Sequence, residues 1–371
     1  MVKSQRAASR FSMHKGATGG VGERRCRIMV LGVGGAGNNT VSRLMESGLT
    51  GAEVVAVNTD LRDLNSTGGA RKVLIGERVT RGLSTCGNSE IGRAAAEESR
   101  PYIEDLLENV EVAFIAVGLG GGTGTGATPV IAEIARRKGA VVVGVVTTPI
   151  RIEKGRMRNV VWALNEMRRV CDTVVVVDGG KLVELTPQLP MNEVFKVADQ
   201  VLANTIKGIV ETLTTPSLIN LDFADFKTIM KKGGLAVLGV GESDTSNRAE
   251  EAVRNALRTT LLNANYAKAK GALVHVSGDA NMTVEEVNRV GEIITEMIGQ
   301  NAVVSWGARV NPQTERALKV TLVMTGVRSP YKLSRFVNLM PKLYDIESSF
   351  SEPEKPLQID LGVDQIENFE D

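Results

Sequence analysis

Residues 118–126 have the composition of a loop that binds a polyanion. Their sequence, GLGGGTGTG, follows the apolar run of residues 112–117 and precedes an apolar pattern with helical spacing at residues 127–135. Glycine has no Cβ, so consecutive backbone N–H groups can turn toward an anion, and the two threonines add hydroxyl donors. The following helix would place its positive N-terminus behind that anion. Strand, glycine loop and helix together predict a phosphate site, and a merely flexible loop is the alternative.

A second glycine loop, GVGGAG at residues 32–37, also lies between an apolar strand and a helical pattern. Alone, it indicates a dinucleotide-binding fold, in which an acidic residue about 20 positions later binds the ribose. Asp60, after the apolar run of residues 53–57, suits that role, so a nicotinamide-dependent oxidoreductase stays open on this loop alone. That hypothesis leaves the loop at 118–126 unused, and no lysine follows that loop as in a Walker motif. Two phosphate loops on one sheet predict a triphosphate ligand.

Short apolar runs alternate with helical patterns through the first half of the chain. This alternation predicts a parallel sheet with helices on both faces. The predicted strands are residues 27–31, 53–57, 112–117, 140–146 and 173–177. A long helix is predicted next, over residues 194–213, because apolar side chains recur there at helical spacing.

After Pro216 the alternation resumes, with strands predicted at residues 235–240, 272–276, 303–310 and 317–325. Helices are predicted at 248–257 and after the capping box that begins at Thr283. We therefore expect an α/β protein whose parts are a Rossmann-like, parallel-sheet nucleotide domain at 26–193, a central helix at 194–215, and a second α/β domain at 216–328. A basic arm at 1–25 and an acidic tail at 329–371 complete the expected organisation.

Composition agrees with a large α/β protein whose charge gathers at its ends. The 371 residues are 43% hydrophobic and carry a net charge of +1. Residues 1–27 hold seven basic side chains and one acidic, whereas residues 345–371 hold nine acidic and one basic. This balance argues against nucleic acid as the main ligand. The basic arm suits a membrane surface or an acidic partner, and a solvated, disordered tail is the alternative.

Cysteine and hydropathy patterns exclude other classes. Three cysteines without a CxxC spacing and two histidines argue against a zinc site, and sparse cysteine fits a reducing cytoplasm. No apolar run approaches the roughly 20 residues of a membrane span, so we expect no direct span.

Four segments occur in the order and spacing of FtsZ, the tubulin-related cell-division GTPase. They are GVGGAGNN at 32–39, NTD at 58–60, GGGTGTG at 120–126 and NLDFAD at 220–225. The resemblance covers about residues 26–328 and is closest to archaeal members. It implies a cytoplasmic protein at the division site that binds GTP or GDP with Mg²⁺, polymerises head to tail with itself, and hydrolyses GTP to GDP and phosphate on polymerisation. A nucleotide-dependent filament protein with little hydrolysis stays open as an alternative.

The resemblance also implies the ligand contacts. Phosphates would be bound by the two glycine loops and neighbouring neutral donors, which are Gly34, Gly35, Asn38, Asn58, Gly121, Gly122, Thr123, Gly124, Thr125 and Gly126. Glu153 and Arg156 would lie on the ribose side, one residue closer together than is usual in the family. Without the resemblance, Asn38 and Asn58 would be expected to satisfy turn or cap hydrogen bonds.

The base would be bound from the central helix. The resemblance implies that Phe195 packs on guanine and that Asp199 binds it. The chemistry fits, since a carboxylate accepts both adjacent donors of guanine, N1–H and the 2-amino group. From the residues alone, Phe195 would be helix core and Asp199 a solvated surface charge.

No residue beside the glycine loops is placed to act as a base, so the catalytic candidates lie elsewhere. They are Asp222 and Asp225, with Asn220, in the segment 218–225 before a predicted helix. From the residues alone, such an aspartate would cap that helix. The resemblance implies instead a loop that reaches the nucleotide of the next subunit and polarises the attacking water.

Some residues depart from the family pattern. The third loop beside the phosphates carries Ser84, Thr85 and Cys86 where Gly and Ala are usual in the family. Cys86 is expected to be a small buried filler, and a reactive thiol near anions is the alternative. Gly179 stands in place of an asparagine, so Asp178 is a candidate for the lost base contact. Tail residues 357–369 alternate apolar and acidic types, and the resemblance implies a membrane-anchoring partner there, an inert tail being the alternative.

Overall fold

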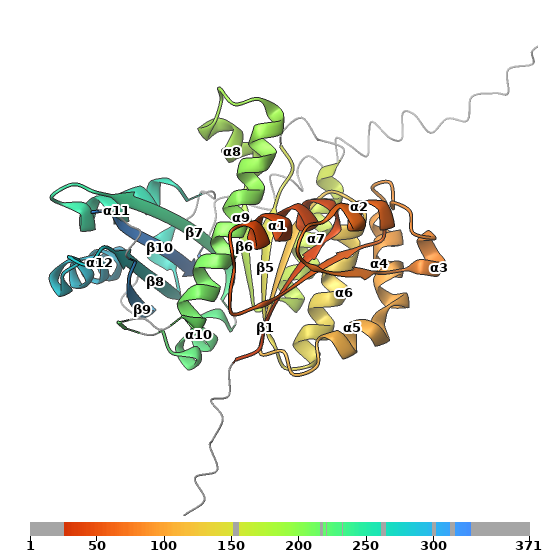
Figure 1. The fold of residues 1–371 in the computed structure, drawn as a ribbon, viewed down its shortest axis with the longest axis horizontal. Helices are drawn as coiled ribbons and strands as arrows, with labels where there is room; N and C mark the ends of the chain where they lie inside the picture. Colours follow the sequence, from red (N-terminus) through yellow and green to blue (C-terminus); the bar gives the residue numbers. More distant parts are fainter. Residues whose placement is uncertain are drawn as a thin grey trace, which may run out of the picture.

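A parallel sheet with helices on both faces forms the first half of the chain (Figure 1). The computed structural model describes residues 26–150, 156–215, 218–219, 221–231, 233–260, 265–298, 302–311 and 316–327. The strands pair in the order β3-β2-β1-β4-β5-β6, each pair parallel. Their bounds are β1 (Ile28–Val33), β2 (Glu53–Asn58), β3 (Arg71–Leu74), β4 (Val112–Gly118), β5 (Val141–Thr147) and β6 (Thr173–Val177).

Two hydrophobic layers sandwich this sheet. In β1, Met29, Leu31 and Val33 pack into one layer, and Ile28 and Val30 into the other, because side chains alternate along a strand. The first layer contains α4, α5, α6 and α7, and the second contains α1 and α9. The helices of this half are α1 (Gly34–Glu46), α2 (Leu61–Ser66), α3 (Glu77–Thr80), α4 (Ser89–Glu98), α5 (Arg100–Leu106), α6 (Thr123–Arg137), α7 (Met157–Val170), α8 (Gly179–Leu185) and α9 (Met191–Thr214).

The sheet continues into the second half of the chain. β7 joins β6 in parallel over three residue pairs, and the order then runs β7-β10-β8-β9, with β10 antiparallel to both neighbours. The elements here are α10 (Phe223–Met230), β7 (Gly234–Ser243), α11 (Arg248–Arg258), η2 (Tyr266–Lys268), β8 (Gly271–Gly278), α12 (Val284–Met297), β9 (Val303–Val310) and β10 (Leu318–Thr325). This continuity was not expected from the sequence, and the domain boundaries stay a prediction.

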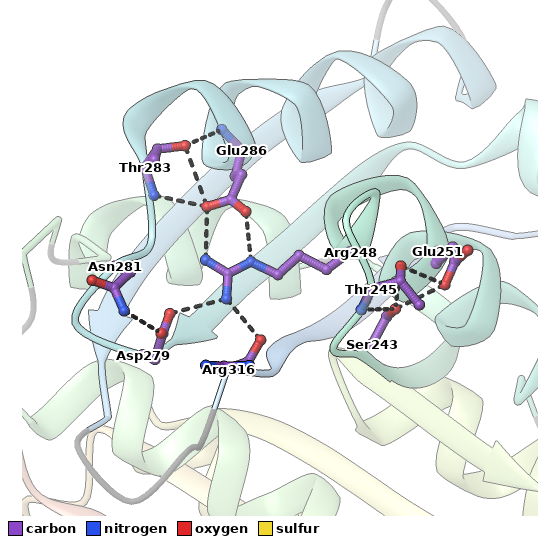
Figure 2. A network of polar contacts seen from close by, with 9 residues as sticks. All are labelled: Ser243, Thr245, Arg248, Glu251, Asp279, Asn281, Thr283, Glu286 and Arg316. Carbon is purple, nitrogen blue, oxygen red and sulfur yellow. Dashed lines mark hydrogen bonds and ion pairs between the residues drawn. The ribbon is translucent and has the colours of Figure 1, made fainter.

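A polar clamp joins the helices of the second half. The guanidinium of Arg248 binds both carboxylate oxygens of Glu286, at 2.5 and 3.1 Å, and the Asp279 carboxylate at 3.0 Å. A further N–H of Arg248 donates to the carbonyl oxygen of Arg316 at 2.8 Å, and Figure 2 shows these partners converging on it. Glu286 also closes the predicted capping box with Thr283, which the structure confirms. One arginine thus ties the starts of α11 and α12 to the loop before β10.

The predicted α/β class and the main elements are confirmed, with small shifts at their ends. β1 extends to Val33 instead of ending at residue 31, and the long helix spans 24 residues, Met191–Thr214. Strand β3 was not predicted. Among the described residues, no helix is long and apolar enough to cross a bilayer. The basic arm and the acidic tail lie outside the described residues.

Candidate functional site

A cavity of ≈ 380 Å³ lies at the carboxyl ends of the central parallel strands. The last residues of β1, β4 and β5, which are Val33, Gly118 and Thr147, line it. The strand order reverses between β1 and β4, and such a switch point is where open parallel sheets bind ligands. Both glycine loops lead from this edge, so one cavity holds the two predicted phosphate loops.

The two glycine loops touch backbone to backbone. Gly34 has a φ of +72°, and a Cβ there would lie 2.8 Å from the Gly124 backbone nitrogen. A Cβ on Gly124 would in turn lie 2.9 Å from the carbonyl oxygen of Val33. Only glycine fits this approach, because any side chain would push the loops apart. Gly34, Gly35, Gly121, Gly122, Thr123 and Gly124 all line the cavity.

Three buried threonine hydroxyls meet at the floor of this cradle. Thr123 Oγ1 lies 2.7 Å from Thr59 Oγ1 and 3.2 Å from Thr85 Oγ1. Thr59 was not predicted from the sequence, although its place directly after Asn58 pointed to the same edge. Thr85 and Ser84 belong to the loop that departs from the family pattern, and both line the cavity. Cys86 was expected to be buried, which is wrong: it is exposed, with a φ of +49°.

Asn38 and Asn58 form a chain of hydrogen bonds that supports the first glycine loop. In the amide orientation that satisfies its neighbours, Asn38 donates to the carbonyl oxygens of Gly32 and Gly34 and accepts from Asn58 at 3.0 Å. Asn58 also donates to the Asp63 carboxylate at 2.9 Å and lines the cavity, whereas Asn38 does not. Asn38 therefore positions the loop, and its direct contact with phosphate stays a prediction.

Thr125 and Gly126 lie deeper, inside the first turn of α6. The Thr125 hydroxyl accepts from the Gly120 backbone N–H at 2.9 Å and so holds the loop's turn. A Cβ on Gly126 would lie 1.9 Å from the carbonyl oxygen of Ser89, which shows how closely α4 and α6 pack. Neither residue lines the cavity, so both support the cradle from behind.

The far wall of the cavity comes from α9. Phe195 is 42% exposed and lines the cavity, so it is not helix core. The Asp199 side chain is only 13% exposed and lines the cavity too. Burial raises the pKa of Asp199 to about 6, and the nearby positive charge of Arg43 opposes that rise. The structure therefore brings an aromatic ring and a carboxylate together on one wall.

The remaining wall lies beside α8. Arg156 lines the cavity, whereas Glu153 is outside the described residues. A Cβ on Gly179 would lie 2.3 Å from the carbonyl oxygen of Thr148, so the neighbouring backbone fills the space of a side chain. Asp178 caps α8 through the Gly180 N–H at 2.9 Å and does not line the cavity. It is therefore not placed to replace the missing asparagine.

The lining is poor in positive charge. Among the described lining residues, Arg156 is the only cation, whereas Asp60, Asp63 and Asp199 are three anions. A triphosphate would need a divalent cation to balance its charge here. The described residues hold no group of three side chains suited to a metal ion, and Asp60 already caps α2. Such a cation fits only if phosphates and water supply most of its ligands.

The predicted catalytic aspartates lie far from this cavity. Asp222 caps α10 through the Ala224 N–H at 2.9 Å, and Asn220 is outside the described residues. The last carbonyl of α10, on Met230, accepts from the hydroxyl of Thr173, the first residue of β6. The helix therefore lies at the amino ends of the parallel strands, opposite the cavity (Figure 1). The α9 helix, about 36 Å long at 1.5 Å per residue, runs between the two ends.

Most of the chain is similar to proteins of one family. A model of the tubulin/FtsZ family GTPase domain matches residues 27–187, and one of the FtsZ family C-terminal domain matches residues 234–328. Cell division protein FtsZ 2 of Methanocaldococcus jannaschii is 48% identical over 307 residues, 82% of this chain and 81% of that protein. Cell division protein FtsZ 1 of Pyrococcus furiosus is 47% identical over 308 residues, 83% of this chain and 82% of that protein.

Solved structures of related proteins are similar to this chain over most of its length. The empty FtsZ dimer of M. jannaschii matches 81% of this chain and 88% of its own, with a TM-score of 0.78 and 46% identity. CetZ2 from Haloferax volcanii, a GTPγS-bound protofilament, matches 87% of this chain and 99% of its own, with a TM-score of 0.75. At 24% identity, the CetZ2 match shows the shared fold alone.

Proposed function

The chain belongs to the FtsZ family of tubulin-related cell-division GTPases, and from this premise we propose that a complete hydrolysis site forms only where two copies meet head to tail. One observation carries the proposal. The phosphate cradle lies at the carboxyl ends of the parallel strands, and the two candidate catalytic aspartates lie with α10 at the amino ends. A single copy therefore holds the two halves of the site on opposite faces.

The cavity is suited to GTP. Backbone N–H groups of the glycine loops and the hydroxyl of Thr123 would bind the phosphates, with the N-terminus of α6 behind them. Phe195 would cover one face of the base, and Asp199 would accept from guanine N1–H and its 2-amino group. Adenine offers no such pair of donors, so Asp199 gives the preference for guanine.

Mg²⁺ is the expected cofactor of the cradle. Bound to the phosphates, it would neutralise charge that Arg156 alone cannot balance. Phosphates and water would supply most of its ligands, and the lining hydroxyls and the carboxylates of Asp60 and Asp63 would be the side chains available to add to them.

Hydrolysis needs little covalent chemistry from the protein. Phosphoryl transfer is accelerated mainly by positioning and by electrostatic stabilisation. Asp222 and Asp225 of the next copy, both exposed, would hold the attacking water in line with the γ-phosphate and accept its proton. Turnover would therefore follow assembly.

Apolar side chains at the two ends support a head-to-tail contact. Leu218 is 70% exposed and Ile219 is 40% exposed beside Asp222. At the other end, Leu61 and Leu83 are 47% and 66% exposed, next to the cavity-lining residues Asp60 and Ser84. When two different surfaces of identical copies join and the rotation between neighbours does not close a ring, the copies assemble into an open filament.

The filament would act in the cytoplasm at the division site. The acidic tail, whose residues 357–369 alternate apolar and acidic types, would bind a membrane-anchoring partner.

Phosphate release measured against protein concentration tests this function. We expect a steep rise above a threshold, and loss of turnover in Asp225→Ala while GTP binding persists. Asp105→Ala is a matched control, because this exposed aspartate lies on α5, which packs on the other face of the sheet from α10. Normal hydrolysis by Asp225→Ala would overturn the shared site, and filaments with negligible turnover would favour a structural filament protein.

A further inference from the structure

We infer that Ser305 is a positioning residue for Asp225, an inference that rests on the proposed function, in which Asp225 acts on the nucleotide of the next copy. Ser305 lies on β9 and donates its hydroxyl proton to Asp225 Oδ2 at 3.0 Å. The two residues are 80 positions apart in the sequence. The contact therefore exists only because α10 packs on the strand.

The surroundings of the two side chains differ sharply. Ser305 is only 7% exposed, whereas Asp225 is exposed at the first turn of α10. A buried hydroxyl destabilises a sheet unless it finds a partner, and serine is a weaker strand former than the valines at 303 and 304. An apolar residue would suit the strand at least as well. The serine is therefore explained by its bond to Asp225 better than by the packing of β9.

The bond determines how Asp225 is presented to the next copy. An exposed aspartate samples several rotamers, and a hydrogen bond from a rigid strand selects one of them. Ser305 occupies Oδ2 and leaves Oδ1 to accept from water. Asp222 is oriented separately, through its bond to the Ala224 N–H. Each of the two aspartates is therefore oriented by a hydrogen-bond donor of its own.

Ser305→Ala tests this role because it removes the anchor and leaves Asp225 in place. We expect kcat for GTP to fall about tenfold, since small misplacements of a catalytic group reduce the rate strongly. The KM for GTP, the assembly threshold and the thermal unfolding midpoint should stay unchanged. Ser305→Thr keeps the hydroxyl and should restore most of the rate. Ser277→Ala, which removes a serine hydroxyl from the neighbouring strand β8, is the matched control and should keep full turnover.

A double mutant separates this inference from the proposed function. In an Asp225→Ala background, Ser305→Ala should have no further effect on residual turnover. Wild-type kcat in Ser305→Ala, or the same fractional loss in both backgrounds, would overturn the inference. If Asp225→Ala itself hydrolyses normally, the shared-site proposal fails first. If Ser305→Ala does not fold, the kcat of Ser305→Thr tests the inference by itself. We expect it to lie near the kcat of Ser277→Ala, and a tenfold loss would contradict the inference.

Discussion

Asp199 Oδ2 lies 4.0 Å from Arg43 Nε, with both side chains largely buried between α9 and α1. The pKa of Asp199 is about 6, because burial raises it more than Arg43 lowers it. The proposed contact between Asp199 and guanine requires the ionised carboxylate, which exists above this pKa. The pair would therefore link nucleotide binding to pH in a predictable direction.

We predict that GTP affinity is constant above about pH 7 and falls as the pH drops through about 6, by up to roughly tenfold per unit, because a proton competes with the base. Titration with a fluorescent GTP analogue from pH 5 to 8 measures this. Asp199→Asn should bind GTP weakly, and its affinity should vary with pH only through protonation of the nucleotide's phosphate. This variant is therefore the reference. Arg43→Gln should move the midpoint upward. An identical pH profile in wild type and Asp199→Asn would contradict this role of Asp199.

Gly34→Ala should abolish nucleotide binding. A methyl group there would meet the Gly124 backbone at 2.8 Å and separate the two loops. Gly139→Ala is the control, since Gly139 also has positive φ, +92°, but a Cβ there has nothing within 4 Å. We expect Gly139→Ala to lower the free energy of unfolding by about 1 kcal/mol and to bind GTP normally. Equal binding by both variants in equilibrium dialysis would show that the loops need no close approach.

Arg248→Ala should destabilise the second half of the chain by about 3 kcal/mol, because it leaves two partly buried carboxylates without their cation. Hydrogen bonds from Arg248 hold the pKa of Glu286 below its ordinary value. The contact between Arg248 and Glu286 therefore stabilises the folded state fully above the pKa that Glu286 has in the unfolded chain, about 4. This stabilisation is lost as the pH falls through the lower pKa that Glu286 has in the folded chain. Urea unfolding at pH 7 and pH 3.5 should show a larger difference in the free energy of unfolding between wild type and Arg248→Ala at pH 7 than at pH 3.5.

Arg289→Ala is the control for Arg248, since Arg289 is 45% exposed and pairs with Glu250 at the surface. It should change the free energy of unfolding much less than Arg248→Ala does, because exposed ion pairs contribute little to stability. Equal effects of the two variants would mean that burial does not strengthen the Arg248 clamp.

The sequence predicted that both glycine loops lie at one edge of the sheet, because glycine patterns between strands and helices are local. It could not predict that Asn38 supports the loop from below while Asn58 lines the cavity, since that depends on packing between β1, β2 and α1. Thr59 and Thr85 meet Thr123 through contacts 64 and 38 residues apart. Contacts between residues so far apart in the sequence depend on the order of the strands in the sheet, which the hydrophobic periodicity of the sequence does not encode.

The second half shows the same limit. Its strands were predicted individually, but their pairing onto β6 through β7 was not. Asp222 and Asp225 were assigned by resemblance, and from the residues alone they were helix caps. Asp222 does cap α10, so the local interpretation and the catalytic one are compatible.

The most direct measurement of the shared site is phosphate release by mixed variants. Gly34→Ala lacks a working cradle but keeps its aspartates, and Asp225→Ala lacks an aspartate but keeps its cradle, so each alone should be inactive. A mixture of Asp222→Ala with Asp225→Ala should stay inactive, because both defects lie at the same end. An equimolar mixture of Gly34→Ala and Asp225→Ala should recover about a quarter of wild-type turnover, since one junction in four joins two intact halves. No recovery in filaments that contain both variants would contradict a site shared between copies.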